Sequence, residues 1–216
     1  MTLQEMDHLD NQMKQWSSRL RDDLKIMPPE SNRLASTIAS EVASLSPEAK
    51  QRIKDASLVP LPVRIEELQA FQGWMDLVHN SNPHPVVARA QIIAQNYIWF
   101  VYLGEACFTI LRKELPAGSA TKKCCKFLTD NPVRAFRNAI AHSNWRYLPD
   151  FTGIGFWAKK GPDAAKEVTC PHCGKELTGY WTKTPEHPEQ FTVLQQDLSF
   201  WQAVARCTGY ASYLSL

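Results

Sequence analysis

Arg137, Asn138 and His142 combine three side chains that suit a reaction at a phosphate. They belong to the stretch RNAIAH, residues 137–142. Asn138 and His142 are four residues apart and would share one face of a helix, which Arg137 flanks. A guanidinium binds phosphate through paired hydrogen bonds, and an imidazole moves a proton near neutral pH. These are the parts that a nuclease needs to cleave RNA without a metal ion.

The RNAIAH stretch is predicted to lie on a helix with its own start signal. Asp130 or Asn131 can cap this helix, and Pro132 falls near its first position, where a missing N–H costs nothing. Apolar residues recur at spacings of three and four and predict one buried stripe, formed by Val133, Phe136 and Ile140. On composition alone, an Arg and a His at a helix end could equally serve to cap its carbonyls.

An Arg, a polar residue directly after it and a His about a turn later, on a late helix of an all-α chain, resemble the signature of the HEPN superfamily. The resemblance covers the RNAIAH helix closely and extends more loosely over residues 65–216. One branch of the family has a Tyr two residues after the His, where this chain has Asn144 and its nearest tyrosine is Tyr147. The chain therefore departs from the branch in which a partner nucleotidyltransferase modifies that tyrosine.

The resemblance implies a metal-independent endoribonuclease of the kind found in toxin–antitoxin, anti-phage and RNA-processing systems. It also implies a homodimer in which two RNAIAH helices face one another across a composite cleft. His142 would move a proton, Arg137 would hold the scissile phosphate, and Asn138 would orient the imidazole or bind the phosphate. The implied partners are RNA, a second copy of the chain, and an antitoxin or defence partner, with no cofactor for catalysis. Other HEPN proteins do not catalyse, so an RNA- or protein-binding module is the alternative.

Positive charge gathers around the RNAIAH helix, although the formal net charge of the whole chain is only +2. Between residues 121 and 147 the single acid is Asp130, and the basic residues are Lys122, Lys123, Lys126, Arg134, Arg137 and Arg146. These side chains form either an ordinary solvated face or a surface that follows an RNA backbone, and the two interpretations are compatible.

Glu105 is a carboxylate in a stretch, residues 97–111, that is otherwise almost entirely apolar. A buried carboxylate should be paired. Its partner is either a structural arginine or Arg137 itself, which Glu105 would then orient toward phosphate. Asn96 lies nine residues earlier, near the same helix face, and could join this network.

Cys170 and Cys173 belong to a second motif, CPHCGK, which resembles one half of a zinc ribbon. Two thiolates separated by two residues can wrap one side of a tetrahedral zinc ion. A closed site needs four ligands, and because no second CxxC exists, His172, His187 or a second chain would have to complete it. The alternatives are a metal-free knuckle on a β-hairpin and a redox thiol pair. Any zinc here is expected to be structural and remote from catalysis.

Composition predicts an ordinary soluble protein of the cytoplasm. The chain has 216 residues, 44% hydrophobic and 21% charged, which suits one sizeable domain or a domain with an extension. No apolar core follows the first Met, and the most apolar stretch, residues 97–104, is too short to span a bilayer. Six cysteines without secretory features favour reduced thiols, and four are expected to be buried on helices: Cys107, Cys124, Cys125 and Cys207.

The predicted fold is all-α, an HEPN-like helical bundle with a small β-hairpin insert at 151–184. Besides the RNAIAH helix, helices are expected over about 3–25, 31–45, 65–79, 86–115, 121–128 and 197–216, with another starting at Pro47 behind a Ser46 cap. Residues 86–115 are expected to be one long helix, buried on several sides. The Pro-rich stretch 59–62 is the expected boundary between an amino-terminal helical arm or subdomain, 1–62, and the HEPN-like domain, 63–216.

Overall fold

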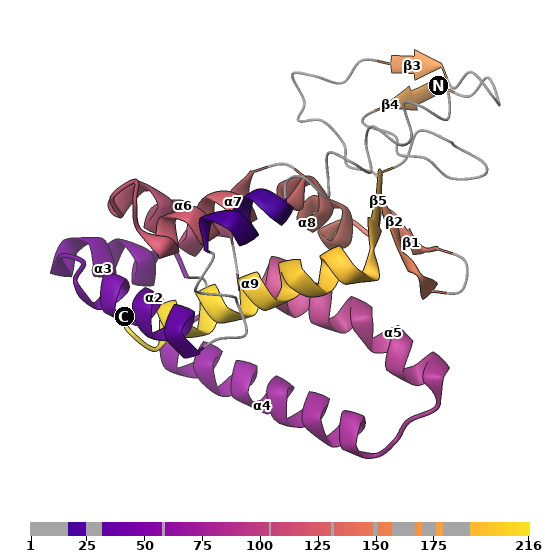
Figure 1. The fold of residues 1–216 in the computed structure, drawn as a ribbon, viewed down its shortest axis with the longest axis horizontal. Helices are drawn as coiled ribbons and strands as arrows, with labels where there is room; N and C mark the ends of the chain where they lie inside the picture. Colours follow the sequence, from indigo (N-terminus) through magenta and orange to yellow (C-terminus); the bar gives the residue numbers. More distant parts are fainter. Residues whose placement is uncertain are drawn as a thin grey trace. The chain divides into compact units, whose positions relative to one another are not determined.

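The computed structural model describes residues 17–24, 32–57, 59–103, 105–130, 132–148, 151–156, 167–169, 176–178 and 191–216. These residues are mostly helical, with small antiparallel sheets, which confirms the predicted fold class (Figure 1). They divide into two compact units. The α8 unit comprises Met1–Arg19 and Asn131–Trp201, and the bundle unit comprises Leu20–Asp130 and Gln202–Leu216. The domain boundary expected at residue 62 stays a prediction.

Helices make up the bundle unit. They are α2 (Asn32–Ala43), α3 (Pro47–Asp55), α4 (Leu61–Asn80), α5 (Pro85–Asn96), the π-helix η1 (Tyr97–Tyr102), α6 (Glu105–Glu114), α7 (Ala120–Thr129) and the carboxyl-terminal part of α9 (Gln195–Tyr213). Helix α7 packs against α2 and α6, and α6 also packs against α3. The predicted Ser46 cap is confirmed, because Ser46 Oγ accepts from the Ala49 N–H at 3.2 Å. Ser119, which was not predicted as a cap, begins α7 in the same way, and its Oγ accepts from the Lys122 N–H at 3.2 Å.

The long helix expected over 86–115 is interrupted, and this expectation was wrong. Regular α5 passes into η1, where the Leu103 N–H donates to the Ile98 carbonyl at 3.1 Å across five residues. The wider π turn changes the phase of the following side chains. Trp99, Phe100 and Leu103 are all buried as a result, while Tyr97 stays half exposed.

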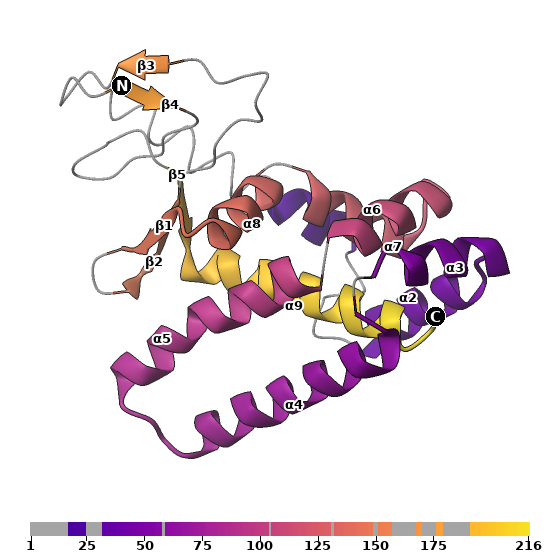
Figure 2. The ribbon, with the colours of Figure 1, turned by 180° about the vertical axis from the view of Figure 1, so that it is seen from behind.

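Helix α4 begins at Leu61, so only Val59 and Pro60 of the predicted extended stretch precede it. Pro62 fits within the first turn because no helical hydrogen bond needs its missing N–H. Helices α4 and α5 form a hairpin, and Figures 1 and 2 show the carboxyl-terminal part of α9, from Gln202 on, running between that hairpin and the α6–α7 pair.

Polar anchors fasten α9 within the bundle unit. The Tyr210 hydroxyl donates to the Leu68 carbonyl, and the Tyr213 hydroxyl donates to the Leu103 carbonyl, both at 2.7 Å. Gln202 Nε2 donates to Oδ1 of the fully buried Asn96 at 2.7 Å. Asn96 is therefore paired with α9.

The described part of the α8 unit consists of residues 17–19, which are helical, one further helix, the strands and the start of α9. Helix α8 (Val133–Ala141) precedes a sheet of order β1-β2-β5, built from β1 (Trp145–Tyr147), β2 (Gly153–Phe156) and β5 (Phe191–Leu194). Strand β2 lies within the predicted β insert, 151–184, whereas β1 and β5 were not predicted. Gly153 is required at the start of β2, because a Cβ there would lie 2.3 Å from the Val193 carbonyl oxygen of β5.

A separate hairpin lies inside the predicted insert. Strands β3 (Glu167–Thr169) and β4 (Glu176–Thr178) pair antiparallel, with the Cα atoms of Thr169 and Glu176 opposite one another. The CPHCGK motif falls between these strands in the sequence, as expected for a knuckle on a hairpin.

No helix in the part of the chain that the structure describes is long and apolar enough to cross a membrane.

Candidate active site on helix α8

The apolar stripe predicted for α8 is buried and fixes the helix on its unit. Val133 and Phe136 are fully buried and Ile140 is nearly so. The Phe136 ring packs edge-on against Phe156 of β2, at 5.2 Å between centroids, and against Trp201 of α9, at 5.7 Å. Because these contacts set the rotation of α8, the polar face with Arg137, Asn138 and His142 is turned away from this core.

The start of α8 differs from the prediction. Pro132 occupies the N-cap position without a side-chain cap, and its carbonyl accepts from the Phe136 N–H at 3.0 Å. A cap from Asp130 was the wrong expectation, since its carboxylate accepts from Arg112 Nη1 at 2.6 Å. This ion pair joins α6 to the end of α7 instead. Asn131, the other candidate cap, lies outside the described residues.

The end of α8 is closed by two backbone hydrogen bonds. The Ser143 N–H donates to the Ile140 carbonyl at 3.3 Å, and the Asn144 N–H donates to the Ala139 carbonyl at 2.8 Å. This pair of bonds is the Schellman arrangement, and Ser143 takes the left-handed conformation that it requires, with φ of 57°. The arrangement stops the helix at His142 and leaves that residue exposed.

Arg137 and Asn138 are brought together on the polar side of α8. Asn138 Oδ1 accepts from Arg137 Nε at 3.2 Å and also from Arg137 Nη2. Both side chains are half-buried. Asn138 therefore holds the guanidinium. Among the described residues, no hydrogen bond joins the His142 side chain to either of them. The other predicted role of Asn138, a hydrogen bond to the phosphate, stays a prediction.

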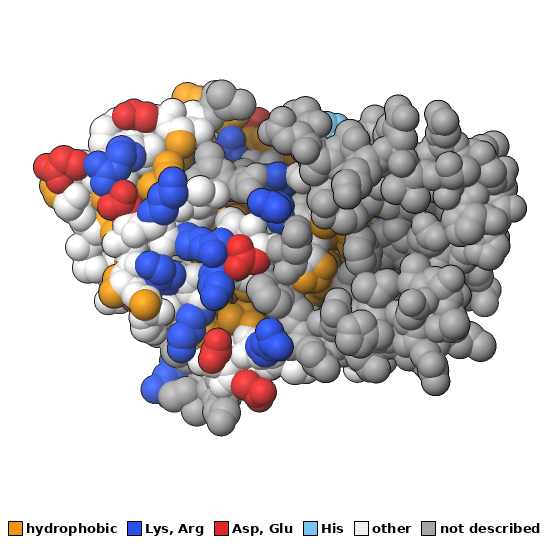
Figure 3. Space-filling view, turned by 90° about the horizontal axis from the view of Figure 1, so that it is seen from above, with side chains coloured by type: hydrophobic (Ala, Val, Ile, Leu, Met, Phe, Trp, Pro, Cys, Tyr) orange, Lys and Arg blue, Asp and Glu red, His pale blue; other side chains and the backbone are white. Residues whose placement is uncertain are grey.

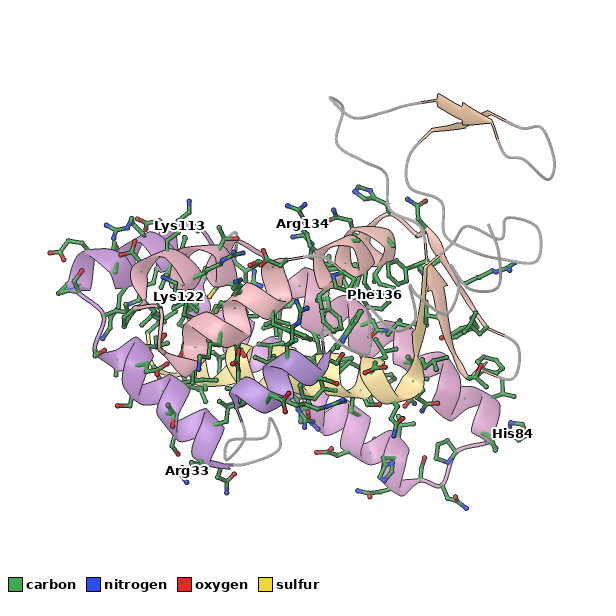
Figure 4. All side chains as sticks on the ribbon, turned by 45° about the horizontal axis from the view of Figure 1, so that its top comes forward. Arg33, His84, Lys113, Lys122, Arg134 and Phe136 are labelled. Atoms are coloured by element: carbon green, nitrogen blue, oxygen red, sulfur yellow. The ribbon has the colours of Figure 1, made fainter. Side chains whose placement is uncertain are left out.

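The predicted RNA-binding residues belong to both units. Arg134 and Arg146 are in the α8 unit, and Figure 4 shows Arg134 pointing away from the ribbon while Phe136 points inward. The three lysines are in the bundle unit, where every other residue of α7 is buried, so its solvent face is lysine throughout: Lys122, Lys123 and Lys126. Figure 3 shows Lys and Arg side chains gathered over α6 and α7. Lys122 is partly engaged, since its Nζ donates to the Leu115 carbonyl at 2.7 Å.

Two predicted sites fall outside what the structure describes. Glu105 begins α6, but its side chain is not among the described ones, so its pairing stays a prediction. Cys170 and Cys173 lie outside the described residues. Within the described ranges, no group of three or more His, Cys, Asp and Glu side chains is arranged to hold a metal ion.

None of the four described cysteines forms a disulfide, as predicted. Cys107, Cys124 and Cys125 are buried, whereas Cys207 is only half-buried. Burial raises the pKa of Cys107 and that of Cys124 to about 12. These two thiols stay protonated near neutral pH and are poor nucleophiles.

Sequence reasoning missed an aromatic row that follows His142. Trp145 and Tyr147 lie on β1, and Phe151 lies in the turn before β2. The alternation of aromatic residues in Trp145-Arg146-Tyr147 was a signal for a strand with one aromatic face. It was missed because three residues are too few to establish a period.

Comparison of the chain with protein-family models, curated proteins and solved structures gives no match. The HEPN resemblance therefore rests on the RNAIAH helix and on its helical context.

Proposed function

We propose that this protein is a metal-independent endoribonuclease of the HEPN type, acting as a toxin or as an anti-phage effector. One observation supports the proposal above others. Arg137 is held by Asn138 on the polar side of α8, one turn before the exposed His142. Residues 132–148 around them contain three arginines and no acidic residue, so an RNA phosphate would meet no repelling carboxylate from this segment.

In the proposed reaction, the ribose 2′-oxygen attacks the adjacent phosphorus, and the bond from phosphorus to the 5′-oxygen breaks. His142 would take the proton of the 2′-hydroxyl or give a proton to the departing 5′-oxygen. Arg137 would bind the phosphate and offset the negative charge that develops on its oxygens. The products are a 2′,3′-cyclic phosphate and a 5′-hydroxyl. DNA lacks the attacking group and would not be cleaved.

Acid–base catalysis of this kind needs a proton acceptor and a proton donor, whereas one α8 helix supplies one His. We therefore propose a homodimer in which two copies of α8 form one cleft. Lys122, Lys123, Lys126, Arg134 and Arg146 would hold the RNA backbone, and Glu105 would support Arg137. A zinc ion at Cys170 and Cys173 would be structural, with no part in the reaction.

The test is cleavage of a labelled single-stranded RNA in the presence of EDTA, with the product ends identified. We expect cyclic-phosphate ends, and a rate about 10²–10⁴-fold lower for His142→Ala or Arg137→Ala. Arg33→Ala and His84→Ala are matched controls, because both side chains are exposed on the bundle unit, as Figure 4 shows for each. These controls should cleave as fast as the parent protein. Cleavage by His142→Ala at the parent rate would contradict the assignment.

A non-catalytic RNA- or protein-binding module is the second candidate. It is favoured by the lack, among the described residues, of a hydrogen bond that orients the His142 imidazole. Measuring both binding and cleavage of RNA distinguishes the two candidates. A binding module would retain RNA or a protein partner without cutting RNA, and His142→Ala would then change affinity but no reaction rate.

A further inference from the structure

Aromatic side chains continue from the end of α8 along the edge of its sheet. Trp145 and Tyr147 pack edge-on, with ring centroids 5.3 Å apart, and the Tyr147 and Phe151 centroids are 4.8 Å apart. All three side chains are half-buried. We call these three residues the aromatic row.

The strand register places the first two members of the aromatic row on the sheet face that packs against α8. Trp145 lies opposite Phe156, and Tyr147 lies opposite Ile154. Side chains of directly opposed residues point to the same face of an antiparallel sheet. Phe156 is fully buried and contacts Phe136 of α8. Trp145 and Tyr147 are only half-buried, so part of each residue on this face stays exposed to solvent.

Charge and chain proximity connect the aromatic row to the proposed catalytic residues. Trp145 follows His142 by three residues, and the Asn144 N–H is bonded back to α8 at 2.8 Å. Arg146 lies between Trp145 and Tyr147 on β1 and pairs with Gly155. Its side chain therefore belongs to the other face of the sheet. Half-buried rings on a segment that carries three arginines and no acidic residue, 132–148, are typical of surfaces that bind unpaired bases together with their phosphates.

We propose that Trp145 and Tyr147, with Phe151, stack unpaired bases of single-stranded RNA beside the phosphate that Arg137 holds. This inference rests on the proposed function and names its substrate class. Duplex RNA would bind less well, since its bases already stack on one another. The bases next to the cleaved bond would then determine where the enzyme cuts.

The test measures binding of a fluorescent 12-nucleotide 2′-O-methyl RNA, which cannot be cleaved because the attacking hydroxyl is blocked. In a series of such oligonucleotides, each position in turn lacks its base. The parent protein should lose about 10-fold in affinity when the base at one or two positions is absent. Trp145→Leu should lose about 10-fold on the intact oligonucleotide and should be insensitive to those same positions. Trp145→Phe should keep most of the affinity, because a ring remains.

Trp74→Leu is the matched control, since Trp74 is a 43% exposed tryptophan on α4 of the bundle unit. Circular dichroism checks the fold, and Tyr147→Leu replaces Trp145→Leu if that variant is misfolded. A leucine variant whose affinity falls at the same missing bases as that of the parent protein would overturn the stacking proposal. If the parent protein still cleaves RNA in that case, the proposed function stands. A parent protein that neither binds nor cleaves RNA would overturn both.

Discussion

Ser143 occupies a backbone position that glycine would occupy at lower cost. Its φ of 57° lies in the left-handed region, where a Cβ approaches the neighbouring carbonyl oxygen. Ser143 directly follows His142, the residue at which α8 ends, so the strained backbone lies at the end of the helix. Non-glycine residues in strained conformations are often found beside functional sites, and the neighbouring His142 fits that tendency.

At the residue scale, Ser143→Gly should therefore stabilise the protein by about 0.5–1 kcal/mol, after allowing for the greater freedom of glycine in the unfolded chain. Ser143→Ala is the matched control, because it removes the hydroxyl and keeps the Cβ, and it should not stabilise. Urea unfolding followed by circular dichroism measures both. A glycine variant less stable than the alanine variant would contradict the backbone argument.

At the element scale, α7 is held by a carboxylate from a helix far away in the sequence. The Glu41 carboxylate of α2 accepts from the Ala120 N–H at 3.0 Å, the Thr121 N–H at 2.8 Å and the Thr121 hydroxyl at 2.6 Å. These two amides belong to the first turn of α7 and have no partner within the helix. A negative charge there also interacts favourably with the helix dipole.

Glu41→Gln should lower the free energy of unfolding by about 1–2 kcal/mol, because a charged acceptor is lost and an amide N–H₂ faces donors. Glu114→Gln is the matched control. Glu114 pairs with Arg52 at 2.8 Å on a largely exposed surface, so the same chemical change should cost less than about 0.5 kcal/mol. Equal losses in guanidinium unfolding would show that the Glu41 contacts contribute no more than a surface ion pair.

At the scale of the whole molecule, the proposed dimer has an electrostatic difficulty. A two-fold axis beside α8 would bring the same patch of each copy together, including both Arg137 side chains. Two guanidinium groups facing one another repel unless an anion lies between them. The bound RNA phosphate would supply that anion.

Light scattering at micromolar protein should therefore show a dimer that sulfate strengthens more than chloride does at equal ionic strength. Arg137→Ala should remove the difference between the two salts, because the repulsion is gone. Arg33→Ala should keep it. A protein that stays monomeric in all conditions and still cleaves RNA would rule out the composite cleft and leave His142 acting within one chain.

Features that depend on residues close together in the chain could be predicted from the amino-acid pattern. Apolar residues spaced three and four apart predicted the buried stripe of α8, and a short polar side chain directly before a proline predicted the Ser46 cap. Helix stripes and caps are local, since the atoms involved lie within about one turn of one another. The residue types and spacing of RNAIAH likewise placed Arg137 and His142 on one helix end.

Contacts between groups far apart in the chain became known only from the folded structure. Asp130 was a candidate cap for α8, but in the structure its carboxylate accepts a hydrogen bond from Arg112, eighteen residues earlier in the chain. Strand β5 has only four residues, too few to show a period in the sequence. It forms a strand because it pairs with β2, which lies before the insert in the chain. The same sheet turned Trp145 and Tyr147 toward the face of α8. Such contacts join segments far apart in the chain, so their free energy depends on the whole fold and leaves no local pattern in the sequence.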